Sequence, residues 1–178
     1  AAPGGFLDAF LFTGKFTIVS VILINVLAFA LALALTKGIK GTNIFRTIFF
    51  MPNLIGGVVL GYVWKTLINC FLSIIGQPLL ALNSTAGYWG LIILMCWQQI
   101  GYMMIVYIAG LQSVPDSVLE AAEIDGANAW KTLFKVKIPM VMSSVTVCLF
   151  LTLSNSFKLF DQNLALTNGQ PYGKGKMT

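Results

Sequence analysis

The sequence contains no histidine and only six acidic residues among its 178 positions. Three cysteines, Cys70, Cys96 and Cys148, lie far apart without the spacing of metal ligands, so we expect them to be small buried hydrophobes. The chain offers no paired carboxylates, no Asp-rich motif and no plausible nucleophile with its base. These absences argue against an enzyme, and we expect neither a metal site nor a catalytic residue.

Charge is scarce as well. Only 10% of the residues are charged and 57% are hydrophobic, whereas about a quarter of a soluble domain is charged. About 20 helical residues cross a hydrocarbon layer of ~30 Å. We therefore expect an all-α, polytopic transmembrane helical bundle with four spans, at 16–35, 47–68, 88–111 and 140–157. The net charge of +5 comes mostly from residues between these spans, which favours contact with lipid headgroups over a role in nucleic-acid binding.

The segments around the spans carry their own expectations. Residues 1–14 are predicted to be a turn-rich external segment, 69–87 a short interfacial helix, and 158–178 a polar tail. Pro52 predicts a kink near the start of the second span or, together with Asn53, a break in the helix next to a cavity, where the freed carbonyls can be satisfied. Gly57 and Gly61 form a GxxxG pair, which indicates either packing within the chain or a specific dimer contact. The termini carry no capping element, so we expect a fragment.

Polar residues interrupt the spans. Gln98 and Tyr102 are four residues apart in the third span and therefore share a helix face. With Asn53 and Asn155 they are candidates for lining a polar path through the bilayer, because intramembrane polar groups are costly and gather at functional surfaces. The alternative is that they only bond to neighbouring helices.

Four of the six acids lie in the loop 113–138, between the third and fourth spans. A helix is predicted from about 115 to 125, ended by Gly126, with carboxylates in its first turns. Asn128 can cap a second helix, on which Trp130 and Phe134 are four residues apart. The loop thus predicts an acidic helix, a glycine turn and a basic helix that leads into Pro139. The basic residues of the second helix are Lys131, Lys135 and Lys137.

From residue 111 onward the chain resembles the inner-membrane permease subunits of bacterial binding-protein-dependent ABC importers. Their signature is EAA, three residues, Gly, nine residues and Ile-x-Leu-Pro. Here Glu120, Ala121 and Ala122 are followed by Gly126, and residues 136–139 read Val-Lys-Ile-Pro, with two conservative departures. The form Asp125-Gly126-Ala127 is similar to the maltose-type, carbohydrate branch. The tail departs from the family, with Gly169-Gln170-Pro171 in place of Gly-Gly-Pro.

This resemblance implies one permease domain over 1–178, matching spans two to five of a six-span core and lacking the first and last. It implies a multi-pass protein of the bacterial cytoplasmic membrane that passes a sugar or related solute inward. The loop 113–138 would be cytoplasmic; basic residues number six on the loop side and five on the other, which does not decide the orientation by itself.

The resemblance also implies partners: a cytoplasmic ATPase dimer that uses ATP and Mg, a second permease subunit, identical or homologous, and a solute-binding protein. This chain would bind no cofactor. The residues 115–139 would couple it to the ATPase. The coupling residues would be Glu120, Ala121, Ala122, Glu123, Asp125, Gly126 and Ala127. A passive channel and a non-transporting scaffold subunit remain alternatives.

Overall fold

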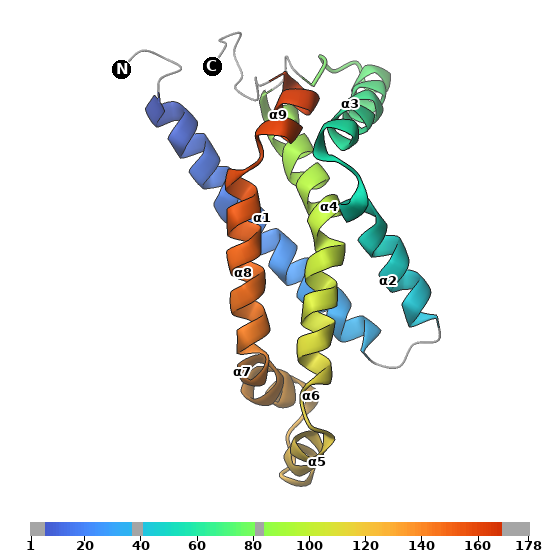
Figure 1. Cartoon of the computed structure of the whole chain (residues 1–178), viewed down its shortest axis with the longest axis vertical. Coiled ribbons are helices and arrows are strands. Elements are labelled where there is room, and N and C mark those ends of the chain that lie inside the picture. The colour runs from blue at the N-terminus through green and yellow to red at the C-terminus, as the bar shows by residue number, and fades with distance from the viewer. Residues whose placement is uncertain (1–5, 37–40, 81–83, 169–178) are drawn as a thin grey trace.

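The computed structural model describes residues 6–36, 41–80 and 84–168, and every regular element in these ranges is a helix (Figure 1). The all-helical class is therefore confirmed. The elements are α1 (Phe6–Leu35), α2 (Thr42–Phe50), η1 (Met51–Leu54), α3 (Gly57–Ile74), α4 (Ser84–Gln112), α5 (Asp116–Ile124), α6 (Ala129–Thr132), η2 (Leu133–Lys137), α7 (Ile138–Met140), α8 (Met142–Phe157) and α9 (Phe160–Thr167).

Three helices, α1, α3 and α4, are long and apolar enough to cross a membrane. A fourth candidate is the pair Ala129–Met140 and Met142–Phe157, which is bent by 70°. Large apolar side chains are exposed along α1, α3 and α8, where a bilayer or partner helices would cover them. The structure thus confirms a membrane bundle of three to four spans.

The second span is broken near Pro52 and Asn53 rather than only kinked. Instead of one kinked helix over 47–68, the chain forms α2, then a 3₁₀ turn at Met51–Leu54, then α3. Ile55 is extended (φ −85°, ψ 131°), so the helix is broken after Pro52. Pro52 cannot donate a backbone hydrogen bond, which accounts for the change at this point.

The predicted connections are also partly wrong. α1 begins at Phe6, inside the segment expected to be turn-rich. The interfacial helix expected within 69–87 is not found: α3 continues to Ile74, no helix forms over 75–80, and α4 begins at Ser84. The tail contains α9, which was missed, whereas Lys37, Lys40 and residues 169–178 lie outside the described residues. Of the three cysteines, Cys96 and Cys148 are buried but Cys70 is exposed.

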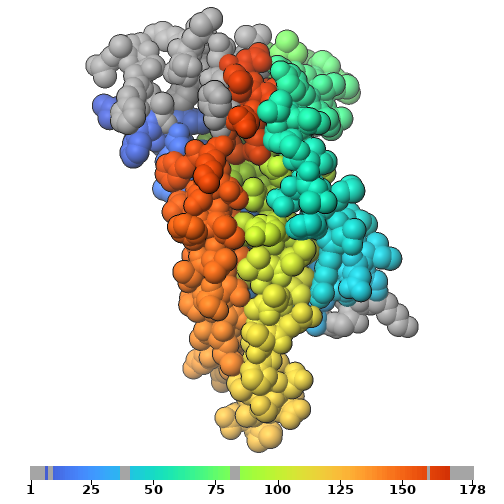
Figure 2. Space-filling model, in the orientation of Figure 1, coloured from blue at the N-terminus to red at the C-terminus, as the bar shows by residue number. Residues whose placement is uncertain are grey.

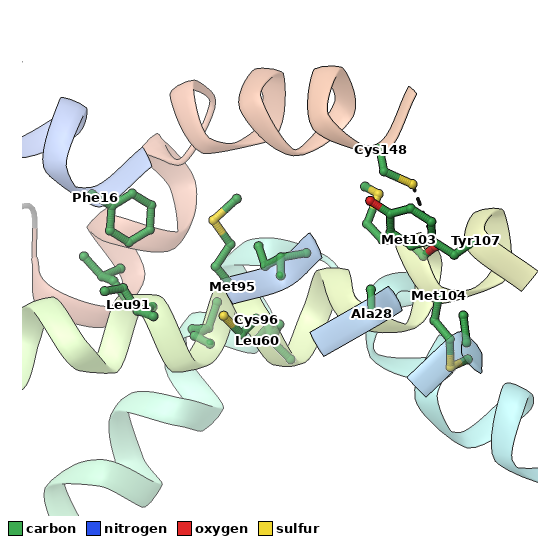
Figure 3. Packing of buried hydrophobic residues seen from close by; sticks show 14 of the residues in the cluster. Phe16, Ala28, Leu60, Leu91, Met95, Cys96, Met103, Met104, Tyr107 and Cys148 are labelled. Carbon is green, nitrogen blue, oxygen red and sulfur yellow. Dashed lines mark hydrogen bonds between the residues drawn. The ribbon is translucent and has the colours of Figure 1, made fainter. Parts of the chain in front are cut away.

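α4 is the central helix, and α1, α2 and α8 all pack against it. Figure 3 shows Phe16 of α1 beside Leu91 of α4 at one end of the core. Further along, Met103 and Tyr107 of α4 lie next to Cys148 of α8, whose sulfur is 3.9 Å from the Met103 carbonyl oxygen (Figure 3). The core is thus a seam along α4 rather than a separate globular centre.

Glycines set how closely the helices approach. A Cβ at Gly101 of α4 would overlap the backbone carbonyl of Phe49 in α2. A Cβ at Gly61 of α3 would lie 2.6 Å from the Cβ of Ala165 in α9. The face that Gly57 and Gly61 form therefore packs within the chain, against α9.

We predict that Gly101→Ala destabilises the protein by about 1–3 kcal/mol, because the added methyl meets backbone that has no side-chain rotamer to change. The gain in helix propensity, about 1 kcal/mol, offsets only part of this. Gly14→Ala in α1 is the matched control, since nothing lies within 4 Å of its Cβ position. Thermal unfolding of the two variants in detergent measures the effect. Equal midpoints would contradict the close approach of α2 and α4.

Candidate functional site

The acidic helix α5 is the part of the chain that projects furthest from the bundle. It begins after Pro115, which has an extended backbone (φ −65°, ψ 137°), and it has nine residues. Figures 1 and 2 show it beyond the ends of α4 and α8, at the opposite end from α9. Asp116 lies in its first turn, where a carboxylate interacts favourably with the helix dipole. The predicted helix is thus present, within one residue of its expected ends.

The side chains of α5 are available to a partner. Glu120, Ala121 and Glu123 are exposed, while Ala122 is half-buried. Within the described part of the chain, neither Glu120 nor Glu123 has an ion-pair partner. Ile124, the last residue of α5, is 86% exposed. α5 therefore presents acids and one apolar side chain around small alanines.

The turn after α5 is a Schellman motif. The amide of Gly126 donates to the Glu123 carbonyl at 3.0 Å, and the amide of Ala127 donates to the Ala122 carbonyl at 2.9 Å. Gly126 has φ +72°, a left-handed conformation that glycine adopts without a Cβ clash. The spacing between the EAA residues and the glycine is therefore the spacing that this helix end requires.

A second cap follows at once. The Asn128 side chain accepts a hydrogen bond from the backbone amide of Lys131 at 2.9 Å, as the sequence predicts. The helix then widens to π geometry over Leu133–Lys137, just before Pro139, which has no amide to continue the ordinary pattern. Val141 (φ −96°, ψ 14°) marks the bend into α8.

Open grooves flank this helix–turn–helix unit. One, of about 530 Å³, lies between α1 and the turn, and the other, of about 370 Å³, lies between the end of α4 and α5. Lys137 lines both. The first is lined by Leu33, Glu123, Ala127, Ala129, Trp130, Thr132, Leu133 and Lys137. The helix–turn–helix unit is thus separated from the bundle by a groove on each side and does not pack closely against it.

The structure divides the four predicted path residues between two faces of α4. Gln98 is 7% exposed and donates to the carbonyl of Ile55, at the break between η1 and α3, at 3.2 Å. Tyr102, one turn further along, is half-buried with its ring 6.4 Å from that of Phe50. Asn53 is half-buried within η1. On the other face, Asn155 of α8 donates to Gln99 at 3.1 Å.

Two further polar groups were missed from the sequence. Gln162 of α9 donates to the Gln98 side chain, and its own side-chain carbonyl oxygen is buried without a hydrogen-bond partner among residues 6–36, 41–80 and 84–168. In the bundle, Asn25 of α1 donates to Thr152 of α8 at 3.0 Å and accepts from the Tyr107 hydroxyl at 2.7 Å. Asn25, a lone polar residue in an apolar run, was a signal in the sequence. Gln162 gave none, because it lies in a segment read as a polar tail.

A bundle of apolar helices with an exposed acidic helix at one end has the architecture of a multi-pass membrane protein. The family model described as "Binding-protein-dependent transport system inner membrane component" matches residues 24–175. The chain belongs to this family and is a multi-pass protein of the inner membrane.

Two relatives agree. The chain is 44% identical over 175 residues to "Probable starch degradation products transport system permease protein AmyD" of Thermoanaerobacterium thermosulfurigenes, covering 93% of this chain and 59% of the relative. It is 31% identical to "Multiple sugar-binding transport system permease protein MsmF" of Streptococcus mutans, covering 94% of this chain and 61% of that protein. The chain thus spans about three fifths of the length of these relatives.

A solved structure shares the fold. The chain superposes with a TM-score of 0.78 on a chain of a bacterial alginate ABC transporter in complex with an alginate pentasaccharide-bound periplasmic protein. The identity is 22%, over 96% of this chain and 65% of that chain. At this identity the likeness supports the fold alone.

We predict that Gly126→Val opens the turn after α5, because a β-branched residue at φ +72° is strained by about 1–2 kcal/mol. Gly126→Asn is the control, since asparagine adopts the left-handed region more readily. Hydrogen exchange of the Gly126–Ala127 region should be roughly tenfold faster in the valine variant, at 1.4 kcal/mol per factor of ten. Similar exchange in both variants would contradict the role of the glycine.

Proposed function

We propose that this chain forms the translocation subunit of an ATP-driven importer, which receives a sugar or related small solute from a solute-binding protein outside the membrane. The observation that carries the proposal is α5: an exposed acidic helix, fixed by a Schellman turn and an asparagine cap, at one end of a membrane bundle. The printed names of the relatives, which concern starch products and multiple sugars, support a carbohydrate as cargo.

In this proposal α5 docks into a cleft of a cytoplasmic ATPase, so the loop 113–138 faces the cytoplasm. The small side chains of Ala121 and Ala122 allow close approach, while Glu120 and Glu123 pair with basic residues of the partner. Ile124 supplies an apolar contact. Asp125, Gly126 and Ala127 form the turn that fixes the angle of α5. Each of these groups is presented outward or makes the local turn, as a rigid docking element requires.

The chain itself has no catalytic role and binds no cofactor in this scheme; ATP and Mg belong to the ATPase dimer. The exposed apolar faces of α1, α3 and α8 fit lipid and a second permease subunit, identical or homologous. A direct test is purification of the full-length subunit with its candidate ATPase. Co-purification supports the importer, whereas solute flux without any bound ATPase would favour a passive channel.

We predict that Glu120→Ala leaves the complex assembled but lowers ATP-driven uptake at least tenfold. Removing one partner of a partly buried interface ion pair costs about 3–5 kcal/mol. Uptake and ATP hydrolysis are measured together in proteoliposomes holding the complete transporter and its binding protein.

Asp161→Asn is the matched control for this experiment, because Asp161 is an exposed acid in the first turn of α9, at the other end of the bundle. It should transport normally. Unchanged uptake in the Glu120 variant would remove Glu120 from the docking surface.

We further propose that Gln98, Tyr102, Asn53 and Asn155 line the route of the solute. A sugar entering a bilayer needs hydrogen-bonding groups in place of water. Gln98, Tyr102 and Asn53 lie around η1 and the extended Ile55, where the chain passes from α2 to α3. The buried Oε1 of Gln162, which has no hydrogen-bond partner among the described residues, adds an acceptor next to Gln98. Asn155 supplies an amide beside Gln99, on the neighbouring face of α4, about 100° around the helix from Gln98.

Tyr102→Phe tests this route most cleanly. The substitution keeps the ring contact with Phe50 and removes only a hydroxyl that has no hydrogen-bond partner within the described residues. We expect the relative uptake of competing sugars to change several-fold, since one hydrogen bond to a solute contributes about 1 kcal/mol. Basal ATP hydrolysis should not change.

Tyr62→Phe on the exposed face of α3 is the control and should keep the original preference. An unchanged preference in the Tyr102 variant would leave the Tyr102 face with a packing role only.

A further inference from the structure

The segment Ala129–Met140 makes an angle of 70° with α8. α8 is the part of this pair that runs along the bundle, so the segment before it lies close to the plane of the membrane, at the end where α5 projects. Figure 1 shows this short coil turning aside at the foot of α8, between α8 and α5. An amphipathic helix set across the end of a span in this way has the orientation of an interfacial helix.

Its aromatic face is uncovered. The rings of Trp130 and Phe134 are stacked, with centroids 6.1 Å apart and planes 14° from parallel. The two side chains are 70% and 60% exposed, although they form one continuous apolar surface. Trp and other aromatic side chains are favoured at the boundary between acyl chains and headgroups. There the ring contacts the apolar chains while its polar edge faces the hydrated headgroups.

The charges beside this face are of one sign. Lys131 and Lys135 are exposed, four residues apart, and Lys137 is half-buried. No acidic residue occurs between Gly126 and Asp161. The nearest acids belong to α5 and its turn, and of these Glu123 lines a groove together with Lys137. Lys131 and Lys135 have no ion-pair partner within the described residues.

We propose that the Trp130–Phe134 face, with Lys131 and Lys135, binds the headgroups of anionic phospholipids. The aromatic pair enters the interface, and the two lysines extend their ammonium groups to the phosphates. Positive charge without neighbouring acids is complementary to an anionic surface, and the 70° bend sets the segment along that surface. The loop is thereby divided: α5 contacts protein, and the helix after Gly126 contacts lipid.

Fluorescence quenching by brominated lipids tests this directly. The full-length subunit is placed in phosphatidylcholine–phosphatidylglycerol vesicles, with either lipid brominated at equal mole fraction. The difference between the wild type and Trp130→Phe gives the part of the quenching that comes from Trp130. We expect brominated phosphatidylglycerol to quench Trp130 several-fold more than brominated phosphatidylcholine, because each lysine near an anionic surface favours it roughly fivefold.

The lysines are tested by the double variant Lys131→Gln, Lys135→Gln. Quenching by the two lipids should become equal while Trp130 stays accessible to both, which shows that the segment remains folded at the membrane. Lys158→Gln, at the other end of α8, is the matched control and should keep the preference.

Three results would overturn the proposal. These are equal quenching in the wild type, a preference that survives in the double variant, and a Trp130 that neither lipid quenches, which would assign the face to a protein partner. The experiment contains no ATPase, ATP or solute, so its outcome is independent of the transport proposal.

Discussion

Where a helix is broken inside a bilayer, no water is present to bond to the backbone groups that the break leaves free. At the break between η1 and α3, the side chain of Gln98 makes this hydrogen bond instead of water. Its amide donates to the Ile55 carbonyl, and its own oxygen accepts from Gln162 of α9. One side chain of α4 thus joins three segments. α9 in turn packs against the glycine face of α3. The Gln98 amide thus links α4 to both α3 and α9 at this end of the bundle.

The end at which α5 projects follows the opposite rule. The hydrogen bonds that end α5 and begin α6 are made within 121–132, mainly by the Schellman turn and by Asn128. No distant residue is needed to define this unit, and grooves separate it from α1 and α4. It can therefore keep its shape when the rest of the bundle rearranges, which is a requirement for any element that transmits movement between subunits.

This contrast explains what could be predicted from the sequence. The acidic helix, the Gly126 turn and the Asn128 cap were predicted closely, because each depends on residues within one or two turns. The break near Pro52 follows from the sequence as well, but the side chain that bonds there does not, because Gln98 is 43 residues away from Ile55. The average hydropathy of a span does not show which distant side chain will form a hydrogen bond to it.

The candidate path shows the same limit. Gln98 and Tyr102 share a face, as their spacing predicts, but Asn155 bonds to Gln99 on another face of α4. Asn25 finds its partners 82 and 127 residues further along the chain. Gln162 lies in a short helix, α9, whose polar sequence resembles a loop. A polar residue in a span thus predicts that a hydrogen-bond partner exists on another helix, but the sequence does not show which residue that partner is.

Because of the 70° bend at Val141, the segment Ala129–Met140 extends sideways from the axis of α8, as a lever arm does. At 1.5 Å per residue its arm is about 18 Å long. A sideways displacement of ~3 Å at the end of this segment would rotate α8 by roughly 10° about its own axis, which is the ratio of that displacement to the length of the arm. Such a rotation would carry Asn155 and Thr152 past their partners on α1 and α4 without lengthening any helix. If lipid headgroups bind the middle of the segment Ala129–Met140, the lipid composition of the membrane would determine how easily this segment and α8 rotate.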